Sequence, residues 1–147
     1  MDIFELLKKD HVKVKQILQE MCETTSRAIK KRQELLQQLI TELQMHEKIE
    51  ESIFYPPLKN NNNTKQLTLE AYEEHHAVDD LIEKLVKLEP SDERWLAILS
   101  VIKENLHHHI QEEENRLFLK AQEEIDEQEL SSMAQSAQAM KQQETRA

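Results

Sequence analysis

Two stretches of the sequence repeat one pattern, and this repeat constrains the fold more than any other feature. The first, HEKIEESIFYP, begins at His46, and the second, HIQEEENRLFL, begins at His109. Each carries a glutamate four residues after its histidine, Glu50 and Glu113, and that interval places both side chains on one face of a helix. Both pairs interrupt apolar stripes, where neither residue type belongs without a partner. The repeat therefore predicts half of a metal site on each of two helices.

The rest of the chain also favours helices. It contains no glycine, only three prolines and few aromatic residues, whereas a sheet would need more β-branched and aromatic positions. Apolar residues recur at steps of three and four, and the pattern breaks near residues 24–26, 56–57, 60–63 and 89–91. We therefore predict an all-α protein, an up-down-up-down antiparallel four-helix bundle with a short C-terminal fifth helix.

The length of 147 residues is typical of one domain. We expect the bundle to cover about residues 2–122 and the C-terminal helix about residues 127–143. Asp2 is the predicted N-cap of the first helix, and the prolines at 56–57 are predicted to end the second.

An antiparallel bundle would bring a set of polar residues to one height. Each of the four long helices carries a histidine on its apolar stripe, and two carry a glutamate as well. At 1.5 Å per residue, all of them fall in a layer roughly 9 to 20 Å from the same end of the bundle. The set is His11, His46, Glu50, His75, His109 and Glu113.

Buried carboxylates without compensation cost several kcal/mol each. Two divalent cations would supply the compensation, and four histidines with two glutamates exceed the needs of one tetrahedral zinc. For His11 or His75 taken singly, a hydrogen-bonded core histidine is the more common explanation. The joint pattern favours a two-metal site with an open position.

Several polar residues beside the predicted layer need a separate interpretation. We expect His76, His107 and His108 to be solvated or to lie beside the ligands. Glu47, Glu51, Glu112 and Glu114 are expected on the exposed face, with Glu47 a candidate for a residue next to a ligand.

The net charge of −10 excludes some partners. An acidic surface repels phosphate backbones and anionic lipids, so we expect neither nucleic acid nor a membrane as a partner. No signal peptide and no membrane-spanning run is evident, and Cys22 is the only cysteine. These features predict a cytoplasmic protein and leave its oligomeric state open.

Four motifs together resemble the hemerythrin-like (HHE cation-binding) domains over almost the whole chain. They are Asp10-His11, HEKIEE with Tyr55-Pro56, EEHHAVDDL at 73–81, and HIQEEENRLF at 109–118. The resemblance implies a four-helix bundle with two iron ions, bridged by carboxylates and by an oxo or hydroxo group. The implied ligands are His11, His46, Glu50, His75, His109 and Glu113, with Glu50 and Glu113 as the bridging residues.

The sequence departs from oxygen-carrying hemerythrins by one histidine. The positions four residues either side of His75 are Ala71 and Asp79, so Asp79, Tyr72, Glu47 or water would have to complete the coordination. This departure disfavours reversible oxygen transport.

We therefore expect a non-haem di-iron protein that binds or senses O2, NO, peroxide or iron at an open site. The alternative is a di-iron enzyme that decomposes peroxide or repairs iron centres under nitrosative or oxidative stress, and the sequence leaves open whether the protein is an enzyme. A third hypothesis is a helical adaptor whose histidines are merely polar core residues.

Overall fold

The computed structural model describes residues 1–146, and over that range the protein is all-α, with no strand. This confirms the predicted all-α class. The elements are α1 (Ile3–Cys22), α2 (Ile29–Ile49), the π-helical η1 (Glu50–Phe54), α3 (Tyr55–Lys59), α4 (Lys65–Lys87), α5 (Trp95–Glu112), the π-helical η2 (Glu113–Leu117), α6 (Phe118–Glu124) and α7 (Glu127–Arg146). None of the described helices combines the length and the apolarity needed to cross a bilayer.

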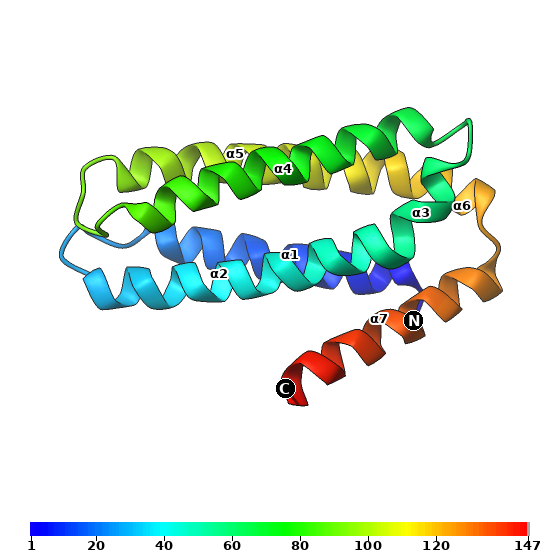
Figure 1. Cartoon of the computed structure of the whole chain (residues 1–147), viewed down its shortest axis with the longest axis horizontal. Coiled ribbons are helices and arrows are strands. Elements are labelled where there is room, and N and C mark those ends of the chain that lie inside the picture. Colours follow the sequence, from blue (N-terminus) through cyan, green and yellow to red (C-terminus); the bar gives the residue numbers. More distant parts are fainter. Residues whose placement is uncertain (147) are drawn as a thin grey trace.

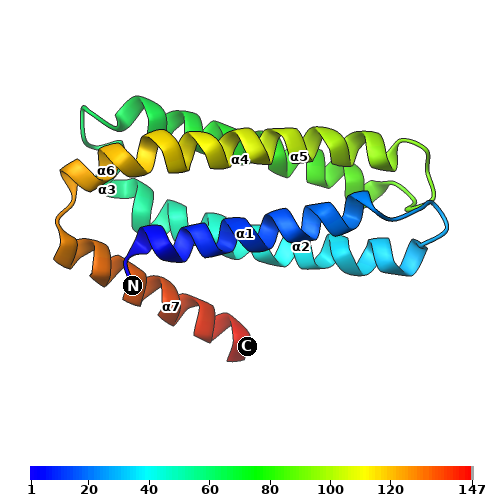
Figure 2. The ribbon, with the colours of Figure 1, turned by 180° about the vertical axis from the view of Figure 1, so that it is seen from behind.

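Four long rods run alongside one another and reverse direction at each connection (Figure 1). The chain pairs α1 with α2 and α4 with α5, and the short helices α3 and α6 lie together at the end where α2 and α5 finish. From behind, α7 is seen to turn back along α1 (Figure 2). Its contacts are with α1, α2 and η1.

Local signals in the sequence explain where α1 begins. Asp2 has extended backbone geometry and its side chain accepts a hydrogen bond from the Glu5 amide at 3.0 Å. The predicted N-cap is therefore confirmed, because the carboxylate satisfies a backbone donor that the first helical turn leaves without a partner.

A buried arginine closes the end of the molecule where α1 passes into α2. Arg32 is 1% exposed and donates hydrogen bonds to the carbonyl oxygens of Thr24 and Pro90. Its guanidinium lies 4.3 Å from the ring centroid of Trp95. One side chain thus ties together the α1–α2 and α4–α5 connections.

The prolines do not end the second helix, so that prediction was wrong. The chain passes from α2 through η1 into α3, and Pro56 and Pro57 occupy the first turn of α3. Proline is accepted there because the first turn of a helix needs no backbone donor. The π-helical turn also shifts the buried face: Phe54 is buried where a regular helical period would favour Ile53, which is only half-buried.

The apolar core consists of two clusters. One, at the α3–α6 end, includes Phe4, Phe54 and Phe118, and the other, towards Arg32, includes Leu18, Leu39, Trp95 and Leu99. The candidate histidines and glutamates are buried but belong to neither cluster. The core is therefore divided by a polar layer, which the apolar side chains on both sides isolate from water.

Candidate metal centre

The structure brings the six predicted residues together. His11, His46, His75 and His109 come from α1, α2, α4 and α5, one histidine per long helix. Glu50 and Glu113 are the first residues of η1 and η2, so both π-helical turns begin at a candidate ligand. All six are at most 5% exposed. π-helical turns are frequent at functional sites, where the extra residue changes which side chains face inwards.

The six residues form two donor groups, and within each group one ligand atom per residue lies within 4.8 Å of the others. The first group contains His11, His46, Glu50 and Glu113, and the second contains Glu50, His75 and His109. Because Glu50 belongs to both groups, the two positions are adjacent.

Each glutamate also lies between histidines of different helices. Glu50 Oε1 is 3.2 Å from His46 Nε2 and 3.0 Å from His75 Nε2. Glu113 places Oε1 3.1 Å from His11 Nε2 and Oε2 3.5 Å from His109 Nε2. Each carboxylate therefore lies close to histidine nitrogens from two different helices.

Several buried polar atoms of the centre make no hydrogen bond, although two of them, His11 Nε2 and Glu113 Oε1, lie 3.1 Å apart as an ion pair. The atoms without a hydrogen bond are His11 Nε2, His46 Nε2, His109 Nε2, Glu50 Oε2 and Glu113 Oε1. Leaving such an atom unsatisfied costs about 1–3 kcal/mol, so a native core rarely holds several together. Bound cations would occupy these lone pairs, and imidazole and carboxylate are suitable donors for iron. The residues present thus fit a metal site.

In each of the four candidate histidines, the Nδ1 nitrogen, which points away from the centre, lies within hydrogen-bonding distance of a carboxylate. His46 Nδ1 lies 2.9 Å from Asp10, and His109 Nδ1 lies 2.7 Å from Glu74. The corresponding oxygens are those of Glu51 for His75, at 2.8 Å, and of Glu114 for His11, at 2.5 Å. A carboxylate on Nδ1 fixes the tautomer and the ring orientation, which leaves Nε2 for a metal ion.

The sequence did not single out these outer carboxylates. Glu51 and Glu114 were expected on the exposed face. That prediction was wrong, because each is half-buried and its carboxylate bonds to a candidate histidine. One signal could have found all four: each acid is the immediate sequence neighbour of a candidate ligand, as in Asp10-His11 and Glu74-His75.

A tyrosine also faces the centre. The fully buried Tyr55 donates a hydrogen bond from its hydroxyl to Glu113 Oε2 at 2.5 Å, and the same hydroxyl lies 3.4 Å from His75 Nε2. Tyr72, which the sequence had suggested for a vacant position, instead packs its ring against Tyr55 with the centroids 5.2 Å apart. Because Tyr55 follows the π-helical turn, a regular helical period could not place it.

The negative charges of the carboxylates in the centre favour the protonated form of His46 and His75. Burial by itself lowers the pKa of His46, but the nearby charge of Glu50 and the hydrogen bond to Asp10 raise it well above the usual range. His75 behaves similarly: burial lowers its pKa, and hydrogen bonding and charge from Glu50 raise it to about 9. Metal ions would have to replace these protons, so their binding releases protons.

A small cavity adjoins the four histidines. Its volume is about 20 Å³, enough for one water-sized molecule. Besides the histidines, it is lined by apolar side chains such as Val14, Val78 and Ile110, and by the acids Glu47 and Glu74. The centre therefore has space for a small molecule beside the two donor groups.

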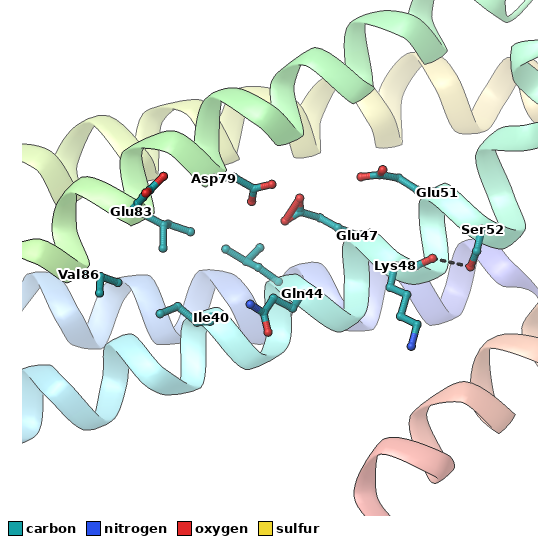
Figure 3. A pocket seen from close by; sticks show the side chains of 11 residues that line it. Ile40, Gln44, Glu47, Lys48, Glu51, Ser52, Asp79, Glu83 and Val86 are labelled. Atoms are coloured by element: carbon teal, nitrogen blue, oxygen red, sulfur yellow. Dashed lines mark hydrogen bonds between the residues drawn. The ribbon is translucent and has the colours of Figure 1, made fainter. Parts of the chain in front are cut away.

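An open groove between α2 and α4 lies outside this cavity, and Glu47 and Leu43 line both. Figure 3 shows Glu47 and Asp79 pointing towards each other across the groove. Burial, with charge and hydrogen bonding from Asp79, raises the pKa of Glu47 to about 8 although His75 opposes the shift. Asp79, a predicted candidate to complete the coordination, thus faces the groove. The hydroxyl that contacts a candidate ligand belongs instead to Tyr55.

Residues 2–121 match the family model of the hemerythrin HHE cation-binding domain, and the chain belongs to that family. A solved structure with a similar fold is the crystal structure of a hemerythrin HHE cation-binding domain-containing protein from Mycobacterium kansasii. The two share 26% sequence identity with a TM-score of 0.83, and the match covers 97% of this chain and 86% of that one. No curated protein matches the chain. Family and donor groups together indicate a metal-binding domain.

Proposed function

We propose that this protein binds two iron ions in the polar layer of an up-down-up-down bundle and uses an open position to bind or sense O2, NO, peroxide or iron. The observation that carries this proposal is the pair of donor groups that share Glu50 and present buried, unsatisfied nitrogen and oxygen atoms. His11, His46 and Glu113 would hold one ion together with Glu50. His75 and His109 would hold the other.

The two glutamates are the proposed bridges. Glu50 is common to both groups, and the two oxygens of Glu113 approach histidines of different groups. Tyr55 would add a phenolic oxygen beside His75, which would compensate for the histidine that oxygen carriers have and this chain lacks. Phenolate bound to one ion would make the two positions chemically unequal.

The size of the small cavity supports the proposal that the ligand is a small molecule. With about 20 Å³ bounded by imidazoles and apolar side chains, it suits a diatomic molecule or peroxide better than an organic substrate. Iron in the centre would supply redox chemistry, while the protein excludes bulk water and holds the histidine rings in place.

The test is elemental analysis of protein purified without chelators, together with its absorption spectrum. We expect two iron ions per chain, near-ultraviolet absorption of a bridged ferric pair, and a higher melting temperature than for metal-free protein, because a ligand bound only by the folded state stabilises it. A chain that takes up no iron and melts at the same temperature with or without chelator would instead be a helical adaptor with a polar core.

The second candidate is a di-iron enzyme that decomposes peroxide or repairs iron centres, and Tyr55 is the observation that favours it. Its hydroxyl is buried, hydrogen-bonded to Glu113 and close to His75, so it could hold a proton beside a bound oxidant. Sustained peroxide turnover that falls strongly in Tyr55→Phe, with iron retained, would support an enzyme. A reaction that stops after one equivalent would support a binding protein or sensor.

A further inference from the structure

Asp10, Glu51, Glu74 and Glu114 are the four outer carboxylates, each bonded to Nδ1 of a candidate histidine. One of them, Asp10, also bonds to a residue of α7, outside the four long helices. Asp10 Oδ2 lies 2.9 Å from His46 Nδ1, and Asp10 Oδ1 accepts a hydrogen bond from Lys141 Nζ at 2.5 Å. Lys141 is on α7, so a chain of two hydrogen bonds connects the C-terminal helix to a candidate ligand. With both oxygens engaged, the carboxylate cannot rotate without breaking one of the two bonds.

Apolar contacts place α7 where Lys141 can reach Asp10. Met133 and Ala137 belong to the same buried cluster as Ile3 and Phe4 of α1. Figure 2 shows α7 turned back along α1, with its C-terminal end level with the middle of the bundle. Lys141 is therefore presented to Asp10 by a helix whose apolar residues are already packed.

The other three outer carboxylates lack this arrangement. The side chains of Glu51, Glu74 and Glu114 are 27% to 35% exposed, whereas that of Asp10 is 8% exposed. In the part of the chain that the structure describes, the ion pairs recorded for these three glutamates are with histidines. Water can therefore reach and compete for each of them.

We propose that Lys141 is a positioning residue through which α7 controls how firmly the centre holds the metal ion beside His46. The inference rests on the proposed function. Lys141 fixes the Asp10 carboxylate, the carboxylate fixes the His46 ring, and the ring presents Nε2 to the ion. Because coupling between two sites is reciprocal, iron binding should in turn strengthen the docking of α7.

The experiment compares three variants of the full chain with the wild type. Lys141→Met removes the cation and keeps the apolar stem, and Lys141→Arg keeps a cation. The matched control is Lys48→Met, which removes another contact of α7, the exposed Lys48–Glu144 ion pair at 3.4 Å, without touching Asp10. Each iron-loaded protein is mixed with excess chelator, and the rate of iron release and the ferric absorption spectrum are recorded.

We expect Lys141→Met to release iron about 10-fold faster than the wild type, at the low end of the 10- to 100-fold loss of metal affinity that follows removal of a histidine's own hydrogen-bond partner, because Lys141 acts on His46 only through Asp10. Its near-ultraviolet spectrum should also shift. Lys141→Arg and Lys48→Met should each remain within about 2-fold of the wild type. Amide hydrogen exchange in α7 should be slower in iron-loaded than in metal-free wild type, and this difference should shrink in Lys141→Met.

Two results would overturn the inference while leaving the proposed function intact: wild-type iron release and spectrum in Lys141→Met, or equal acceleration in Lys48→Met. The first would show that Asp10 needs no outside support, and the second that any loosening of α7 has the same effect. If the wild type itself takes up no iron, the proposed function fails and the inference fails with it.

Discussion

The two halves of the chain build the centre in the same way. In the first half, Asp10 precedes His11 and bonds to His46 on the following helix; in the second, Glu74 precedes His75 and bonds to His109 on the following helix. The acid that follows each of the candidate ligands Glu50 and Glu113 then crosses to the other half, Glu51 to His75 and Glu114 to His11. The repeated sequence motif thus corresponds to a repeated hydrogen-bond pattern with approximate twofold symmetry.

The halves differ at positions that bear on reactivity. Tyr55 in the first motif corresponds to Phe118 in the second, where an apolar ring lies parallel to His11 with centroids 6.2 Å apart. Glu47 corresponds in the same alignment to Ile110, and both line the small cavity. The comparison teaches that the repeat supplies the candidate ligands, while the substitutions between its copies give the two donor groups different surroundings.

The largest effect is expected for Glu50→Ala, because Glu50 alone belongs to both donor groups. We predict loss of nearly all bound iron, whereas Glu113→Ala should retain a part of it. Elemental analysis after gel filtration measures the iron, with far-ultraviolet circular dichroism as the control for folding. Equal iron contents in the two variants would show that the glutamates are equivalent and that the symmetry extends to the bridges.

Exchanging the aromatic residues tests the asymmetry directly. Tyr55→Phe should remove a phenolate-to-iron absorption band from the visible spectrum and speed iron release about 10-fold. Phe118→Tyr should gain no such band, and it should lower the free energy of unfolding by about 1–3 kcal/mol, because a hydroxyl is buried among apolar rings. A visible band in the Phe118→Tyr single variant would mean that the two positions are interchangeable.

The outer carboxylates should respond according to their burial. Asp10→Asn should weaken iron binding by about 100-fold and Glu74→Gln by about 10-fold, because water can replace the more exposed Glu74 but not Asp10. Competition with a chelator of known affinity gives both values. If Glu74→Gln proves the more damaging, burial does not decide the importance of these residues.

The smallest effect concerns Glu47, and it depends on pH. Burial and the nearby acids raise the pKa of Glu47 from 4.5 to about 8, so the folded state binds the extra proton between these values and stability falls as pH rises through them. In metal-free protein, the stabilisation given by Glu47→Gln should therefore grow by on the order of 2 kcal/mol between about pH 6 and pH 9. Urea unfolding at both pH values measures it, and Glu83→Gln in the same groove is the control. An advantage that is constant with pH would show that Glu47 is not titrating in this range.

The sequence by itself determined the helical class and the meeting of the six candidate ligands. A period of 3.6 residues decides which face of a helix is buried, and antiparallel helices of similar length decide the height at which residues meet. Both quantities can be counted along the chain, which is why His11 and Glu113 were predicted to lie together although they are distant in sequence.

Only the tertiary structure decided what surrounds those ligands. The π-helical turns at Glu50 and Glu113 add a residue to the helical period, and this shift brings Tyr55 to the centre. The contacts of Asp10 with His46 and Lys141 join residues far apart in the chain, and they depend on how α7 packs against α1. Such partners are selected by packing between elements, which no local period encodes.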